Sequence, residues 1–181
     1  MIKQVSHSLE ETAQIAHEWL RGISENKNRM DSRPGTNLLI RLRGNDTDTA
    51  TIIGLSGHLG AGKTAFTKCV AKDLGITEDV TSPTFVIMKI YDIDPTKVVA
   101  DLTENGAANF PWKRLVHIDA YRLERAQELE AINFAKYAAD PDNLILIEWP
   151  ENVKGAVEKL EGYSQINFSV GEGENERVVE Y

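Results

Sequence analysis

The sequence has a single cysteine, Cys69, among its 181 residues. One thiol cannot form a disulfide within the chain, so a scaffold held together by internal disulfides is excluded. Cys69 shares a helical spacing with Phe66, Val70 and Leu74, which predicts a thiol packed in the core. The cysteine usage is typical of a reducing compartment, and we expect a cytoplasmic protein.

Long hydrophobic runs and an excess of basic charge are also missing. The longest apolar runs, such as residues 144–147, have the length of a strand, and the first thirty residues lack the pattern of a cleaved signal. The 28 acidic and 20 basic residues give a formal net charge of -8. A protein that binds nucleic acid without partner proteins usually presents a basic surface, so direct tight binding of RNA or DNA is disfavoured. No membrane contact is expected.

Strand-like and helix-like segments alternate along the chain. A helix is expected from about Leu9 to Ile23, started by a capping box of Ser8 and Glu11 and followed by an exposed polar linker. Strands are expected in the runs 38–44, 50–57, 84–93, 114–119 and 143–149, a helix after the second run, a helical segment over 124–140 that breaks near Asn133, and a closing antiparallel pair at 164–170 and 176–181. This order predicts a single three-layer α/β domain over residues 1–181, with a mainly parallel central sheet and antiparallel edge strands.

The stretch "SGHLGAGKTAF", residues 56–66, contains a glycine, four residues and then Gly-Lys-Thr, between an expected strand and an expected helix. This is the pattern of a loop that binds nucleotide phosphates, and it makes the predicted domain P-loop NTPase-like. Lys63 is expected to reach the β- and γ-phosphates, and the Thr64 hydroxyl to ligate Mg²⁺. The expected nucleotide-binding loop comprises Gly57, His58, Leu59, Gly60, Ala61, Gly62, Lys63, Thr64 and Ala65.

Two carboxylates follow apolar runs and should stand at the carboxyl ends of strands, where nucleotides bind in such sheets. Asp119 ends "RLVHID" and Glu148 ends "LILIE". A phosphate loop needs an acidic group opposite it to hold Mg²⁺ or the attacking water, and either residue suits that role. Thr84, in "SPTF", is placed to sense the γ-phosphate, although an ordinary turn explains it equally well.

Two further side chains lie close to these motifs. Trp149 follows Glu148, and a tryptophan in this place is more often a packing residue than a platform for a base. His58 occupies a variable position of the loop, where side chains usually point to solvent because the backbone amides hold the phosphate. A protonated histidine there would instead add positive charge near the nucleotide or a partner.

Taken in order, "GHLGAGKTAF", "TSPTF", "HIDAYRLE" and "LILIEWPEN" resemble the motifs of the TsaE family, the bacterial ATPases of tRNA threonylcarbamoyladenosine biosynthesis. The resemblance covers roughly residues 6–153. The glycine loop is shared with many unrelated nucleotide-binding proteins, whereas "HIDAYRL" and "IEWPE" make the assignment specific. Two features differ from the family pattern, namely insertions near 24–36 and 94–113 and His58 at a position where the family usually has aspartate.

The resemblance implies a Mg²⁺-dependent ATPase, weak alone, that serves the complex placing a threonylcarbamoyl group on the adenosine beside the anticodon of certain tRNAs. Its implied partners are TsaD, which transfers the group, and TsaB, with tRNA reached only through them. Carried over by position, Lys63, Thr84, Asp119 and Glu148 are the catalytic residues, and Thr64, Asp119 and Glu148 the metal residues. Trp149 matches the family's tryptophan, and Thr12 ends the segment that approaches the base.

Two other classes of function remain open from the residues alone. A small-molecule kinase normally carries an arginine-bearing lid over the donor phosphates, and Arg122 and Arg125 are the nearest candidates, without a clear lid around them. A nucleotide-dependent regulatory module is the other class. A GTP-driven switch would usually carry an Asn-Lys-x-Asp segment on a late loop, but Asn26-Lys27 lies in the N-terminal part and lacks the aspartate.

Overall fold

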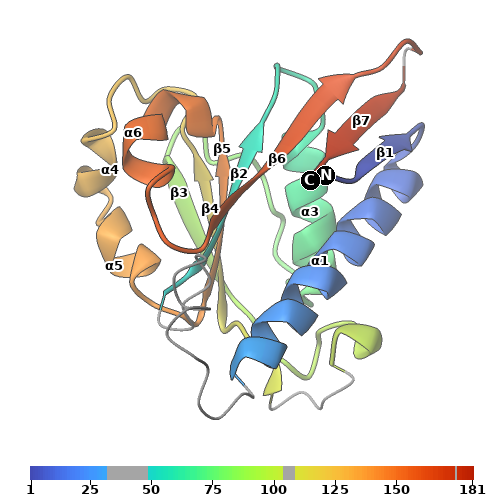
Figure 1. The fold of residues 1–181 in the computed structure, drawn as a ribbon, viewed down its shortest axis with the longest axis horizontal. Helices are drawn as coiled ribbons and strands as arrows, with labels where there is room; N and C mark the ends of the chain where they lie inside the picture. The colour runs from blue at the N-terminus through green and yellow to red at the C-terminus, as the bar shows by residue number, and fades with distance from the viewer. Residues whose placement is uncertain (32–48, 104–108, 174) are drawn as a thin grey trace.

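The computed structural model describes residues 1–31, 49–103, 109–173 and 175–181, and these build one seven-stranded sheet with helices on both faces (Figure 1). The strands are β1 (Lys3–Ser6), β2 (Thr51–Ser56), β3 (Met88–Asp92), β4 (Arg114–Asp119), β5 (Asn143–Glu148), β6 (Tyr163–Val170) and β7 (Arg177–Glu180). The helices are α1 (Leu9–Asp31), α3 (Lys63–Asp73), α4 (Glu128–Ala131), α5 (Phe134–Ala138) and α6 (Lys154–Val157), with short 3₁₀ turns η1 (Ala100–Thr103) and η3 (Pro150–Val153).

The sheet has the order β1-β7-β6-β2-β5-β4-β3. Strand β2 pairs in parallel with β5 and with β6, and β5 pairs in parallel with β4. The pairs β1–β7, β6–β7 and β3–β4 are antiparallel. The predicted mainly parallel centre with antiparallel edge strands is therefore confirmed, and antiparallel strands occupy both edges.

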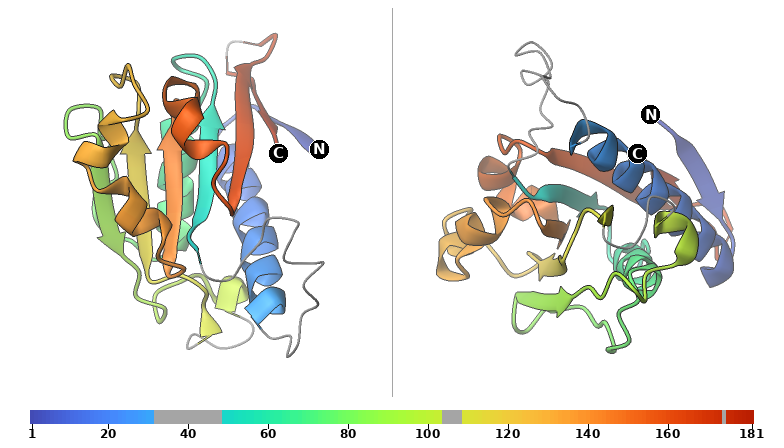
Figure 2. Two further views of the ribbon diagram at one scale, coloured as in Figure 1. Left: turned by 60° about the vertical axis from the view of Figure 1, so that its left-hand side comes forward. Right: turned by 90° about the horizontal axis from the view of Figure 1, so that it is seen from below.

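Alternate residues of the central strands pack into two different cores, one on each face of the sheet. Ile53, Leu115 and Leu146 belong to the core beneath α1 and α3, whereas Ile52 and Val116 belong to the core beneath α4, α5 and α6. The two views of Figure 2 show these helical layers on opposite faces of the sheet. The predicted three-layer architecture is confirmed, because the period of two in each strand supplies an apolar side chain to both layers.

Several predicted boundaries differ from the structure. Helix α1 continues to Asp31, so residues 24–31 are helical and not the predicted linker, because no glycine or proline interrupts the helix-forming residues there. Strand β3 begins at Met88 instead of 84, because residues after Pro83 turn and Ile87 has φ 67°. The strand expected at 38–44 lies outside the described residues. The predicted break near Asn133 is confirmed, since this residue has φ 55° between α4 and α5.

The start of α1 shows one half of the predicted capping box. The backbone N–H of Glu11 donates to Ser8 Oγ over 3.1 Å, as the motif requires. The Glu11 carboxylate, however, accepts from the backbone N–H of His7 at 2.7 Å and not from that of Ser8. The cap thereby fixes the turn between β1 and α1, which lies beside the glycine loop.

The two ends of the chain meet at one edge of the sheet. The Ile2 and Tyr181 backbones exchange hydrogen bonds, with N···O distances of 2.6 and 3.0 Å. Because strands from both ends complete one sheet, we propose that residues 1–181 form a single domain.

The insertions near 24–36 and 94–113 stay predictions. Four residues of the second one are buried in the core beneath α1 and α3, namely Val98, Leu102, Phe110 and Trp112. In the described ranges, no helix has the length and apolar character to cross a membrane.

One histidine links three elements on the α1 side of the sheet. His17 Nδ1 lies 2.9 Å from Asp73 Oδ2 at the end of α3, and His17 Nε2 lies 2.7 Å from Asp101 Oδ2 in η1. Partial burial alone would lower the pKa of His17, but the hydrogen bonds and charges of Asp73 and Asp101 raise it above 6.5. The folded protein therefore binds this proton more tightly than the unfolded chain does.

Replacing His17 by glutamine is expected to make the free energy of unfolding less dependent on pH. Since the folded-state pKa is raised, the stabilisation by His17 is complete below about pH 6.5 and is lost as the pH rises through the folded-state value. Denaturant unfolding of both proteins should show a difference that is larger at pH 6 than at pH 8.5 by about 0.5–1 kcal/mol, because the pair is partly screened by solvent. A difference that is constant or grows with pH would contradict the prediction.

Candidate active site

The glycine loop joins β2 to α3 at the carboxyl end of the parallel strands. Gly57, Gly60 and Gly62 have φ values of 146°, 77° and 107°, a region that other residues rarely adopt. A Cβ on Gly57 would collide with the carbonyl oxygen of Phe168, so only glycine fits between the loop and β6. Helix α3 then begins at Lys63 with its first N–H groups near the loop, an arrangement that favours an anion.

Lys63 is the buried cation of this loop. Its Nζ donates to the carbonyl oxygens of Gly57 and His58 at 2.5 and 3.0 Å, and it lies 3.9 Å from the centroid of the Trp149 ring. Only 4% of the residue is exposed. Burial lowers the pKa of the Lys63 ammonium, and the nearby charges of Glu148 and other carboxylates oppose that shift. The loop therefore holds a buried lysine on its own backbone carbonyls at the start of α3.

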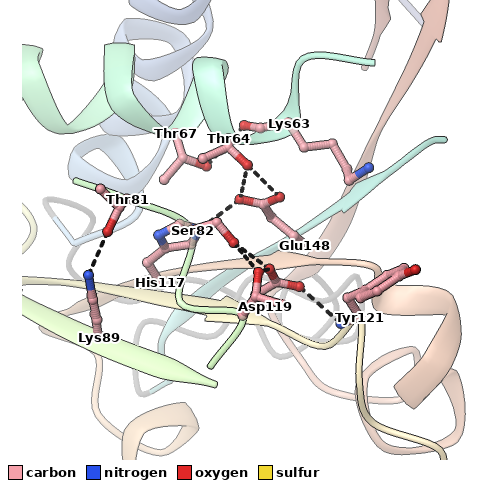
Figure 3. Close-up of polar contacts among 11 residues, drawn as sticks. Lys63, Thr64, Thr67, Thr81, Ser82, Lys89, His117, Asp119, Tyr121 and Glu148 are labelled. Carbon is pink, nitrogen blue, oxygen red and sulfur yellow. Dashed lines mark hydrogen bonds and ion pairs between the residues drawn. The ribbon is translucent and has the colours of Figure 1, made fainter. Parts of the chain in front are cut away.

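Glu148 lies directly opposite the start of α3. The Thr64 hydroxyl donates to this carboxylate, with 2.9 Å to each oxygen, and His117 Nε2 lies 2.9 Å from its Oε1 (Figure 3). Glu148 is 3% exposed. Because the hydroxyl hydrogen points to Glu148, the lone pairs of Thr64 Oγ1 stay available to a cation.

Asp119 lies level with Glu148 on the neighbouring strand, since the two residues are partners in the β4–β5 register. Its Oδ2 accepts hydrogen bonds from the hydroxyls of Ser82 and Thr84, each at 2.5 Å, and these hydroxyls lie 2.6 Å apart. Its Oδ1 accepts from the backbone N–H of Tyr121 at 3.0 Å. The structure thus brings Thr84 to Asp119, and the segment around Pro83 is held against the strand end.

The oxygen atoms around Thr64 fit the preferences of Mg²⁺. This ion takes oxygen ligands and keeps several waters, usually with one or two carboxylates and the phosphates of a substrate. Thr64, Glu148 and Asp119 supply a hydroxyl and two carboxylates on one side of the loop. In the described parts of the chain, no group of three or more His, Cys, Asp or Glu residues could hold a metal ion, so a cation here would depend on phosphate and water oxygens as well.

A pocket of about 430 Å³ lies on the other side of the loop. Thr12 is buried at its wall, where its hydroxyl lies 2.7 Å from Ser6 Oγ and donates to the Ser8 carbonyl at 3.0 Å. Arg177 from β7 also lines the pocket and donates from Nε to the Gly60 carbonyl at 3.0 Å. The full lining is Ser6, His7, Ser8, Leu9, Thr12, Gly60, Gly62, Ala65, Asn175 and Arg177.

Trp149 is half-buried and does not line that pocket. Its ring lies beneath Lys63 and packs against Tyr121, with 5.1 Å between ring centroids. Its backbone has φ 59°, and its N–H donates to the Leu55 carbonyl at 3.2 Å. The structure therefore separates the two residues that the resemblance implies for the nucleotide, with Trp149 near the lysine and Thr12 on the far side of the loop.

Other predicted residues lie at the surface. His58 is exposed and contributes its backbone carbonyl to Lys63, which agrees with a solvent-facing side chain. Arg122, considered as a lid residue for a kinase, stacks on Phe85 at 4.4 Å from the ring centroid.

Cys69 is partly buried against the core beneath α1 and α3, close to the predicted core position. A larger cavity of about 680 Å³, lined largely by α4, α5 and the turn after α6, contains none of the predicted site residues.

Three polar residues of the site were not predicted from the sequence. His117 could have been found, because it lies two residues before Asp119 and so shares its face of the strand. Ser82 had the same signal as Thr84, a hydroxyl beside Pro83. Arg177 had no local signal, since it reaches Gly60 from a strand 117 residues away in the chain.

A strand, a glycine loop and a helix on a mainly parallel sheet define a P-loop NTPase-like α/β protein. The crystal structure of YdiB from Bacillus subtilis has this fold, with a TM-score of 0.55, 24% sequence identity, and coverage of 98% of this chain and 82% of YdiB. At this identity the similarity concerns the fold alone.

Sequence comparison identifies the family to which this P-loop NTPase-like protein belongs. The family model of "Threonylcarbamoyl adenosine biosynthesis protein TsaE" matches residues 6–179, and the chain belongs to the TsaE family. The "tRNA threonylcarbamoyladenosine biosynthesis protein TsaE" of Borreliella burgdorferi is 36% identical over 129 residues, 71% of this chain and 79% of that protein. The Haemophilus influenzae protein of the same name is 30% identical over 122 residues, 67% of this chain and 66% of its own length. The resemblance carried by the four motifs is confirmed.

Proposed function

We propose that this chain is the Mg²⁺-dependent ATPase subunit of the bacterial complex that forms threonylcarbamoyladenosine next to the anticodon of tRNA. One observation carries the ATPase assignment. The glycine loop and the start of α3 bring Lys63 and Thr64 next to Glu148, whose carboxylate accepts from the Thr64 hydroxyl, and Asp119 stands level with Glu148 on the neighbouring strand. A lysine, a hydroxyl and two carboxylates in this arrangement are the functional groups typical of a site that hydrolyses a nucleoside triphosphate.

The residues of the chain divide this work between binding of the phosphates and binding of the metal. The backbone amides of the loop and Lys63 bind the phosphate oxygens, and the start of α3 favours their negative charge. Thr64, Glu148 and Asp119 would hold Mg²⁺, which would neutralise charge on the phosphates. Glu148 would also orient the attacking water and accept its proton.

The pocket lined by Thr12 and Arg177 would receive the base and ribose, because it adjoins Gly60 and Gly62 on the side of the loop away from Glu148. Family resemblance supports this placement through the segment that ends at Thr12. ATP is the proposed nucleotide, since the Asn-Lys-x-Asp segment typical of guanine recognition is missing from the sequence.

The proposed partners are TsaD and TsaB, which the family resemblance implies, and the proposed location is the cytoplasm. The acidic composition supports an indirect relation to tRNA, since a net charge of -8 is unfavourable for gripping a polyanion. On this proposal the partners supply the tRNA-binding surface, and this chain supplies nucleotide turnover.

Reconstitution tests the proposal directly. Purified TsaD and TsaB, unmodified tRNA, the threonylcarbamoyl donor and ATP with Mg²⁺ are combined with and without this chain, and threonylcarbamoyladenosine is measured by mass spectrometry. We expect sustained modification only when the chain is present, together with ATP hydrolysis that increases when the partners are added. Equal modification without the chain would contradict the proposal, as would ATP-dependent phosphorylation of a metabolite in the absence of any partner.

A further inference from the structure

A buried histidine lies beside the carboxylate that receives the Thr64 hydroxyl. The His117 side chain is 0% exposed, and its Nε2 lies 2.9 Å from Glu148 Oε1. Figure 3 shows the His117 ring and the Thr64 hydroxyl approaching the same carboxylate. His117 is the first residue of the "HIDAYRL" motif, but binding of phosphate or metal by the loop and the two carboxylates does not itself call for a histidine at this position.

The strand pattern makes this histidine unexpected as a packing residue. Leu115 and Leu146 lie in the core beneath α1 and α3, while Val116 and Ile118 lie in the core on the other face. By alternation, His117 occupies the position at which an apolar side chain would continue the first of these cores. A buried imidazole costs free energy unless it is hydrogen-bonded, and Glu148 supplies that bond.

The partners of the ring determine which nitrogen carries the hydrogen. Glu148 already accepts a hydrogen bond from Thr64, and an ionised carboxylate has no hydrogen to give, so His117 Nε2 is the donor. His117 Nδ1 is buried, and within the described part of the chain it has no hydrogen-bond partner. A hydrogen on Nδ1 would be left unsatisfied, which favours a ring with its one hydrogen on Nε2.

We propose that His117 is a positioning residue that fixes Glu148 in the orientation in which both of its oxygens meet the Thr64 hydroxyl. A glutamate side chain has three rotatable bonds, and the hydrogen bond from Thr64 alone would not fix the rotation about all of them. A second donor from the rigid centre of the sheet orders the carboxylate before any ligand arrives, and such preorganisation favours the transition state over the ground state. The consequence for turnover rests on the proposed ATPase function, whereas the hydrogen bond itself does not.

Two variants separate positioning from packing. His117→Leu keeps an apolar side chain of similar size and removes the donor, and His117→Gln keeps an N–H that can reach the position of Nε2. In His117→Leu we expect kcat for ATP hydrolysis to fall about 10- to 100-fold, with KM and the Kd of a non-hydrolysable ATP analogue within about threefold of wild type. In His117→Gln we expect kcat to return to within about fivefold of wild type.

A matched control comes from the other end of β5. Asn143 is also a buried polar residue, bonded to Arg114 and to the Tyr137 carbonyl. Asn143→Leu should lower the unfolding temperature but leave kcat of the folded protein within about twofold of wild type. Unfolding curves of all variants identify any variant that does not fold. If His117→Leu does not fold, the rate of His117→Gln and a nitrogen-15 NMR spectrum of the wild-type protein test whether His117 positions Glu148.

Nitrogen-15 NMR of the wild-type protein without nucleotide shows which ring nitrogen of His117 carries a hydrogen, and this measurement does not depend on activity. The expected spectrum has the His117 hydrogen on Nε2, with Nδ1 unprotonated. A ring with its hydrogen on Nδ1 and none on Nε2, equal loss of kcat in His117→Leu and His117→Gln, or a loss confined to KM would each overturn the proposal. If wild-type protein hydrolyses no ATP, the proposed function fails, but the spectrum still decides whether His117 donates to Glu148.

Discussion

Replacing Glu148 by glutamine is expected to reduce ATP hydrolysis about 100-fold or more while the Kd for ATP changes by less than about threefold. Glutamine preserves the size of the side chain and can still accept from Thr64 and His117, so the fold around the strand end should persist. The negative charge and the basic oxygen are lost. A group that holds Mg²⁺ and orients water acts mainly on the transition state, which is why the rate should fall far more than the affinity.

The measurement is steady-state hydrolysis together with equilibrium binding of ATP. Glu158→Gln is the matched control, because this exposed carboxylate pairs with Lys154 one turn earlier in the chain; its rate should stay within about twofold of wild type. Equal losses of binding and hydrolysis in Glu148→Gln would mean that the phosphate site itself had collapsed, and the assigned role would then be wrong.

Much of the fold followed from local pattern in the sequence. The central strands are long apolar runs bounded by polar residues, and β5 is buried along its entire length. The glycine loop could be placed because its motif requires a strand before it and a helix after it. Strand β1, which was not predicted, has a weak apolar pattern, and its register with β7 links residues from opposite ends of the chain. A pairing over that distance leaves no local signal.

The carboxylates of the site were predictable for a physical reason. Asp119 and Glu148 each end an apolar strand, and parallel neighbours in register bring such residues level with each other. Of the two hydroxyls that bind Asp119, Thr84 was singled out from the sequence as a sensor of the γ-phosphate and not for this contact, and Ser82 was not singled out. The role of an individual side chain depends on its partners across the sheet, and a single sequence does not specify those partners.

The surroundings of Lys63 show how the loop and the sheet act as one unit. Its ammonium bonds to two carbonyls of its own loop and lies over Trp149, which follows the catalytic candidate Glu148 on β5. The turn that places Trp149 has a left-handed backbone and is tied to β2 by a hydrogen bond to Leu55. The lysine is therefore held from the loop and from the neighbouring strand end, which leaves its side chain little conformational freedom.

Replacing Lys63 by alanine is expected to weaken ATP binding by at least about 10-fold, to reduce hydrolysis about 100- to 1,000-fold, and to abolish tRNA modification in the reconstituted system. The buried ammonium is the cation that the motif directs to the β- and γ-phosphates, and the helix terminus alone supplies only a partial charge. Lys68→Ala is the control, since Lys68 is exposed on the same helix, and it should retain activity within about twofold. Modification by Lys63→Ala at the wild-type rate would show that this chain serves the complex without its nucleotide site, and the ATPase role would have to be abandoned.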